Sequence, residues 1–102
     1  MFKIILLILN IIFCIEDKSK RIVNLTKERW NHIIERHPDV NNLNLIIQTL
    51  ENPSIIKYDK FDDMLNYYYK YIKEERIYLL VVVKYIKDKG SIITSFYTKS
   101  VK

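Results

Sequence analysis

The second half of the chain consists of short segments in which apolar residues alternate with polar ones or follow one another without interruption. Both patterns are typical of β-strands, and the polar connections between these segments are short. Strands are therefore predicted at residues 54–58, 64–72, 77–86 and 91–98. Because residues 78–83 are apolar on both faces, their strand is expected to lie in the centre of an antiparallel meander.

Two helices are predicted before these strands. Thr26 is a suitable N-cap, and residues 27–37 contain no helix breaker before Pro38, so the first helix is expected to end there. The second helix is expected to end at Asn52, and one apolar stripe marks its buried side. The residues of that stripe follow the spacing i, i+3, i+4, i+7: Leu43, Ile46, Ile47 and Leu50.

The chain begins with an apolar run over residues 4–15, which is interrupted by Asn10. The run is shorter than the roughly 20 residues that a membrane span requires, and small residues of a cleavage site are missing. We expect a β-strand here, with a secretory signal or a membrane anchor as the alternatives. Residues 11–16 and 21–25, joined by a polar turn, are predicted to form a hairpin.

The predicted elements define an α+β fold class. In this interpretation, the N-terminal hairpin and two helices pack on a four-stranded antiparallel meander sheet. The 102 residues are enough for one hydrophobic core, so residues 1–102 are expected to form a single domain. Residues 1–10 are expected to add a further strand or to form an apolar N-terminal segment.

Composition adds two constraints. Seventeen Lys and Arg residues against twelve Asp and Glu residues give a net charge of +5, which favours an anionic partner. The abundance of Tyr and Lys accompanies a general enrichment in Ile and Asn, so it is weak evidence for an RNA-binding surface. A single cysteine, Cys14, excludes an intrachain disulfide and a cysteine-based zinc site, and we expect its thiol to be buried and inert.

Both histidines of the chain fall in the first predicted helix. At 100° per residue, Arg29, His32 and Arg36 project from one face, whereas Trp30 and His37 lie on the adjacent face. RNA can be cut without a metal ion when a base removes the 2′-OH proton, an acid protonates the leaving oxygen and a cation neutralises the phosphate. Histidine and arginine on one helix can supply these roles. The alternative is an ordinary solvated helix face.

Strand residues are candidates for the same site. Thr94 points to one face of the last strand, and Ser95 and Tyr97 point to the other, so only one of these sets can face the helix. Tyr68 and Lys70 are expected to reach the same cleft as substrate-binding residues. Ordinary cross-strand pairing is the alternative for the hydroxyl residues.

Other types of site have little support in the sequence. His32 and His37 are five residues apart on a helix, so they diverge by about 140° and cannot bind one metal ion. Gly90 is the only glycine, which excludes a glycine-rich phosphate loop. We therefore expect neither a metal nor a small-molecule cofactor.

The segment Leu25-Thr26-Lys27-Glu28-Arg29-Trp30-Asn31-His32-Ile33-Ile34-Glu35-Arg36-His37-Pro38 resembles the first helix of phage-type nuclease-like domains of the barnase, EndoU, colicin and RelE superfamily. The helix end at residues 50–53 and the closing strand at residues 92–97 fit the same order of elements, so the resemblance spans residues 11–102. It implies metal-independent cleavage of RNA. By the same resemblance, His32 and Arg36 match a His-x-x-x-Arg pair and His37 the following histidine, while the closing strand contributes Thr94, Ser95 and Tyr97.

These observations predict an endoribonuclease-like toxin or effector domain of phage or mobile-element type. In this hypothesis, His32 is a general acid or base, Arg36 and Arg29 bind phosphate, and the strand hydroxyls position the substrate. RNA is the expected partner, with an antitoxin or immunity protein as a second one, and no stable membrane insertion is expected. The alternative is a module of the same fold that binds RNA or protein without cutting it. A cytoplasmic location is expected, with secretion or membrane association through the apolar N-terminus as the alternative.

Overall fold

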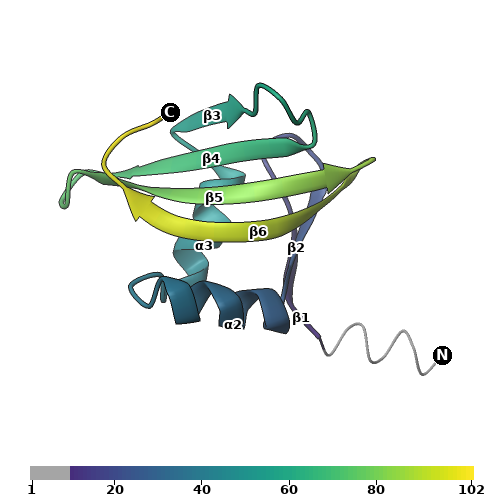
Figure 1. The fold of residues 1–102 in the computed structure, drawn as a ribbon, viewed down its shortest axis with the longest axis horizontal. Coiled ribbons are helices and arrows are strands. Elements are labelled where there is room, and N and C mark those ends of the chain that lie inside the picture. Colours follow the sequence, from purple (N-terminus) through teal and green to yellow (C-terminus); the bar gives the residue numbers. More distant parts are fainter. Residues whose placement is uncertain (1–9) are drawn as a thin grey trace.

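The computed structural model describes residues 10–102, which fold into two helices and six strands (Figure 1). The α+β class is confirmed, and each predicted element within these residues is present with ends no more than two residues from the prediction. The apolar residues 4–9 lie outside the described part of the chain. In chain order the elements are β1 (Ile11–Glu16), β2 (Ile22–Thr26), α2 (Lys27–Arg36), α3 (Leu43–Glu51), β3 (Ile55–Tyr58), β4 (Leu65–Ile72), β5 (Ile77–Ile86) and β6 (Lys89–Thr98).

All six strands belong to one mixed sheet with the order β1-β2-β6-β5-β4-β3. Strands β3 to β6 form the expected antiparallel meander, but the prediction of a four-stranded antiparallel sheet is wrong. The β1–β2 hairpin extends the sheet because residues 22–24 of β2 pair in parallel with residues 89–91 of β6. No local pattern could predict this pairing, since the two segments are far apart in the sequence.

Gly90 lies at the middle of this parallel contact, opposite Val23. A Cβ atom built on Gly90 would lie 2.8 Å from Cε1 of Tyr85 and 2.9 Å from Cγ atoms of both Val23 and Val83. These distances are shorter than van der Waals contacts. The lack of a side chain at Gly90 therefore lets β2 and β6 come together over the core.

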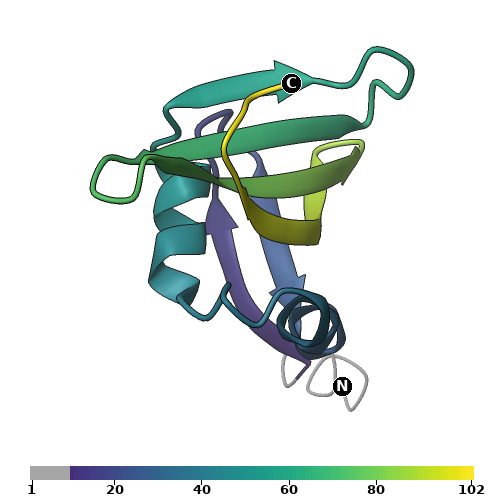
Figure 2. The ribbon, with the colours of Figure 1, turned by 60° about the vertical axis from the view of Figure 1, so that its left-hand side comes forward.

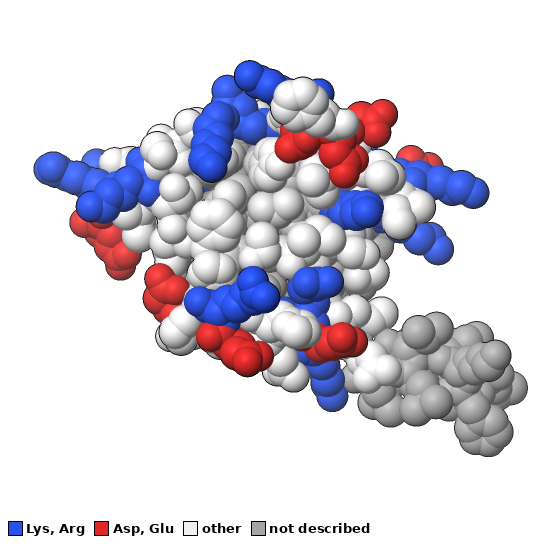
Figure 3. Space-filling model, viewed as in Figure 1, with Lys and Arg blue, Asp and Glu red and all other residues white. Residues whose placement is uncertain are grey.

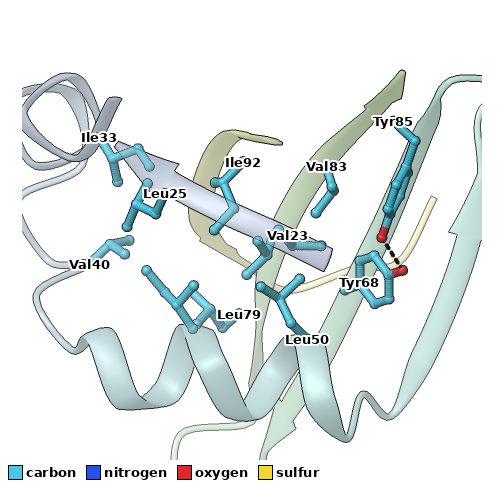
Figure 4. Packing of buried hydrophobic residues seen from close by; sticks show 12 residues of the cluster. Val23, Leu25, Ile33, Val40, Leu50, Tyr68, Leu79, Val83, Tyr85 and Ile92 are labelled. Carbon is cyan, nitrogen blue, oxygen red and sulfur yellow. Dashed lines mark hydrogen bonds between the residues drawn. The ribbon is translucent and has the colours of Figure 1, made fainter. Parts of the chain in front are cut away.

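The sheet has a helix-covered face and an open face. On the helix-covered face, Leu79, Val81 and Val83 of β5 pack with α2, α3 and the hairpin in the main core (Figure 4). On the open face, Leu80 and Val82 belong to a second, smaller apolar cluster. Both faces of β5 are buried, so the prediction of a central strand is confirmed.

Both helices begin and end where the sequence predicts. Thr26 caps α2 by accepting a hydrogen bond from the backbone N–H of Arg29, and Asn42 caps α3 in the same way through Leu45. Helix α2 buries Ile33, and α3 buries three residues against β4 and β5. None of the helices among residues 10–102 has the length and apolar character that crossing a membrane requires.

The open face is partly crossed by the end of the chain. After β6, the last residues run over β5 and β4 towards β3 (Figures 1 and 2). Val101 packs on the smaller cluster, and the backbone N–H of Lys102 lies 3.5 Å from the hydroxyl oxygen of Tyr69. This segment therefore forms a wall along one end of the open face.

A buried carboxylate joins the hairpin to the meander. Asp17, in the turn after β1, is 3% exposed and accepts hydrogen bonds from the hydroxyls of Tyr68 and Tyr85. It also accepts hydrogen bonds from Ser19 and from the backbone N–H of Arg21. Burial raises the pKa of Asp17, but the hydrogen bonds from these four residues outweigh it and hold the pKa below its usual value of 3.8.

The structure also corrects the environment of Cys14. The sequence predicts a buried thiol, but Cys14 is exposed. Strand β1 is the outermost strand of the sheet, so alternate side chains along it point away from the core.

Gly90→Ala is expected to destabilise the fold. Gly90 does not have a positive φ, so by backbone entropy alone alanine would stabilise the protein by about 0.4–1 kcal/mol. The close contacts around the added methyl group outweigh this gain. We therefore expect the free energy of unfolding, measured in urea, to fall by about 1–3 kcal/mol. Ser91→Ala, at the exposed neighbouring position, is the control. Equal or higher stability of Gly90→Ala would show that β2 and β6 do not need this close approach.

Asp17→Asn is expected to lower the free energy of unfolding by about 2 kcal/mol at neutral pH, because the amide replaces a charged acceptor of several hydrogen bonds. The pKa of Asp17 is lowered in the folded state, so its stabilisation is present above pH 3.8 and is lost as the pH falls through the folded value. The difference in free energy of unfolding between the wild type and Asp17→Asn should therefore shrink below about pH 4. A difference in urea unfolding that stays constant down to the lowest pH would contradict this account.

Candidate functional site

The short contact between β2 and β6 decides where α2 lies. Only residues 22–24 pair with β6, and the chain enters α2 at Lys27. Helix α2 then lies along the remaining length of β6 and packs against it (Figures 1 and 2). The polar face of α2 is thereby placed beside the open face of the sheet.

A hollow of about 480 Å³ lies between α2 and β6, and we name it the α2–β6 hollow. Five of its lining residues come from α2 and its C-cap, and three come from β6. They are Arg29, His32, Ile33, Arg36, His37, Ile93, Thr94 and Phe96. Both histidines and both arginines predicted from the sequence are thus in one place, together with one of the predicted hydroxyls.

The two histidines differ in their surroundings. His32 is exposed on the middle of α2, with Arg29 and Arg36 about one turn away on either side. His37 is half-buried at the C-cap, where its backbone N–H donates to the carbonyl oxygen of Ile33 over 2.7 Å. Its ring stacks on Phe96, with ring centres 5.3 Å apart and planes inclined by 30°. His32 is therefore an exposed polar group, whereas the ring of His37 packs on Phe96.

A β-bulge in β6 positions Thr94. The pairing with β5 shifts between Val82 and Val83, so Val82 pairs with Thr94 and Val83 pairs with Ile92. The extra residue, Ile93, lies on the open face beside Thr94, and both line the α2–β6 hollow. Bulges of this kind change the direction of side chains and are common next to functional sites.

Ser95 and Tyr97 point to the opposite face from Thr94, as the alternation along the strand predicts. Ser95 is fully buried and donates a hydrogen bond to the carbonyl oxygen of Leu80 over 2.8 Å. Tyr97 packs on the main core, and burial raises the pKa of its hydroxyl. Of the three predicted residues of the closing strand, only Thr94 lines the hollow.

The expectation that Tyr68 and Lys70 reach the same cleft is wrong. Tyr68 is fully buried on the helix-covered face and donates to Asp17. Lys70 donates from Nζ to the carbonyl oxygen of Asn52 over 2.8 Å, at the end of α3. Both residues point towards α3 and the hairpin because they share the face of β4 opposite to the open face.

Phe96 and Ile93 also line the α2–β6 hollow, although neither is among the residues predicted from the sequence. Phe96 shares the open face with Thr94 because it lies two residues further along the strand, and this alternation could have revealed it. No sequence pattern predicts Ile93, since its position depends on the bulge.

The charge of the α2–β6 hollow suits an anion. Two of its described lining residues are arginines, and none is acidic. Acidic side chains do lie beside the basic ones on the surface over α2 (Figure 3). Among residues 10–102, no group of three or more His, Cys, Asp or Glu side chains is placed to hold a metal ion. The arrangement can bind a phosphate group through guanidinium donors while imidazoles lie within the same hollow.

Comparison with known protein families gives one match, which covers residues 8–102. The matching family is described as phage-Barnase-EndoU-ColicinE5/D-RelE like nuclease2. No protein of curated function matches the chain. The match includes every residue of the α2–β6 hollow.

Proposed function

The chain belongs to this family of nuclease-like domains, and from that premise we propose that it cleaves RNA by attack of a 2′-hydroxyl, without a metal ion. The observation that carries the proposal is the α2–β6 hollow, which holds two imidazoles, two guanidinium groups and the Thr94 hydroxyl. These are the groups that such a reaction needs: proton acceptors and donors, and fixed positive charge. The phage-type description of the family also supports a role as an effector of a phage or mobile element, and a neutralising protein as its partner is part of the proposal.

The arginines bind the scissile phosphate in this proposal. Arg29 and Arg36 are exposed along the same side of α2, and a guanidinium group can donate two parallel hydrogen bonds to two phosphate oxygens. Negative charge builds on these oxygens during attack at phosphorus. Cations held on a rigid helix stabilise that charge without reorganising at the moment of reaction.

The histidines move the protons. His32 is exposed and removes the proton of the 2′-hydroxyl, while His37, fixed on Phe96, donates a proton to the leaving 5′-oxygen. A bond forms between the 2′-oxygen and phosphorus, and the bond from phosphorus to the 5′-oxygen breaks. The products are a 2′,3′-cyclic phosphate and a 5′-hydroxyl. The Thr94 hydroxyl, opposite α2, positions the phosphate or the ribose.

The test compares cleavage rate and melting temperature for three variants. Arg36→Lys keeps the charge but loses paired donation to phosphate, so we expect at least a tenfold slower rate, about 1.4 kcal/mol of transition-state stabilisation. His32→Ala should lose more, because a proton transfer is lost. Both side chains are exposed, so the melting temperature should change little.

His37→Ala is expected to lower both the rate and the melting temperature, because its ring packs on Phe96. Rates are therefore compared well below the melting temperature of each variant. If Arg36→Lys and His32→Ala both cleave RNA like the wild type, the catalytic assignment fails. If the wild type binds RNA but never cleaves it, the domain is a binding module.

A further inference from the structure

A second hollow, of about 560 Å³, lies on the open face of the sheet, and we name it the aromatic hollow. Leu80 and Val82 of β5 lie beneath it, and Tyr67, Tyr69 and Phe96 contribute rings from the two neighbouring strands. Its sides are β3 with the loop that follows it and the end of the chain. Phe96 lines both hollows, so the aromatic hollow adjoins the α2–β6 hollow.

Basic side chains border this apolar floor at β3, at the loop after it and at the end of the chain. Lys57, Lys60 and Lys102 line the aromatic hollow, and Asp59 is the only acidic residue among its described lining residues. Charged side chains, basic and acidic together, lie above and below an uncharged middle of this view (Figure 3). This combination of an apolar, ring-lined floor with a basic rim is complementary to an unpaired base between phosphates.

The loop after β3 is braced and presents an aromatic ring. The carboxylate of Asp59 accepts hydrogen bonds from the backbone N–H groups of Phe61 and Asp62 and from the hydroxyl of Tyr67. The hydrogen bond to Asp59 raises the pKa of Tyr67 to about 12, so this hydroxyl remains a donor at neutral pH. Phe61 is nevertheless 97% exposed at the edge of the aromatic hollow. Among residues 10–102, almost nothing covers the Phe61 ring.

We propose that the aromatic hollow binds an unpaired base of single-stranded RNA, next to the phosphate held in the α2–β6 hollow. The proposal rests on the proposed function for its choice of RNA. Phe61 stacks on the base, the floor rings exclude water from it, and the lysines bind the flanking phosphates. The position of the aromatic hollow beside the α2–β6 hollow and its basic rim favour nucleic acid over a protein partner, whose surface would have to complement both the rings and the lysines.

Binding is measured with single-stranded oligonucleotides that carry a 2′-O-methyl group on every ribose. These cannot react by 2′-oxygen attack, so affinity is determined by fluorescence anisotropy on the intact wild-type protein whether or not the protein cleaves RNA. Phe61→Ala is expected to bind at least about fivefold more weakly. Lys60→Ala should reduce the slope of log affinity against log salt by about 0.7, the value for one phosphate contact. Phe61 is almost fully exposed, so its variant will fold.

Matched controls come from the other end of the sheet. Ile22→Ala changes an exposed apolar residue of β2, and Lys18→Ala changes an exposed lysine between β1 and β2. Neither residue lines a hollow, so both variants should bind like the wild type. The same sequence made double-stranded should bind more weakly, because its bases are not free to stack.

The outcomes separate this proposal from the proposed function. If Phe61→Ala binds more weakly and the wild type never cleaves RNA, the base-binding site is supported and the proposed nuclease activity is wrong. If the wild type cleaves RNA and Phe61→Ala has the same affinity and cleavage rate as the wild type, the base-binding site is wrong and the proposed nuclease activity stands. Absence of binding by the wild type, or a wild-type dimer that Phe61→Ala converts to monomer, overturns the base-binding site.

Discussion

The arrangement depends on a parallel contact of three residue pairs between β2 and β6, centred on Gly90. Because β2 and β6 approach closely, the hairpin and the meander form one sheet. Because they pair over only three residues, most of β6 has no strand neighbour on that side. Helix α2 takes the free place, because the chain turns into the helix directly after β2. If β2 paired with β6 over more residues, the added pairs would reach Thr94 and its neighbours. The strand would then keep α2 away from them. The contact therefore sets both the extent of the sheet and the position of the candidate site.

The site follows from this placement by simple side-chain geometry. Alternation along β6 and the bulge at Ile93 put Thr94 and Phe96 on the open face, and the helical repeat puts His32 and Arg36 opposite them. The Phe96 ring belongs to both sites: it stacks on His37, and it lines the aromatic hollow. In the proposed mechanism, packing, phosphate binding and base recognition fall to neighbouring side chains on one face of the molecule.

Local patterns predicted most of the fold. The Thr26 cap of α2, the end of α3 at Asn52 and the double-sided apolar run of β5 are properties of short segments, and the structure confirms them. The parallel joining of β2 to β6 was missed because it depends on residues far apart in the sequence. Cys14, Tyr68 and Lys70 were misplaced for a related reason: a strand pattern shows which residues share a face, but not which face is covered. For the site, the helix motif located the basic and imidazole groups, whereas the choice of Thr94 over Ser95 required the sheet.

In the proposed mechanism, side chains alone cleave RNA through attack of its own 2′-hydroxyl. The most direct measurement is incubation of the purified protein with a short single-stranded RNA in excess EDTA, followed by mass spectrometry of the fragment ends. The account predicts undiminished cleavage and fragments that carry a 2′,3′-cyclic phosphate and a 5′-hydroxyl. Cleavage that stops in EDTA and returns with Mg²⁺, or fragments with a 5′-phosphate, would contradict it.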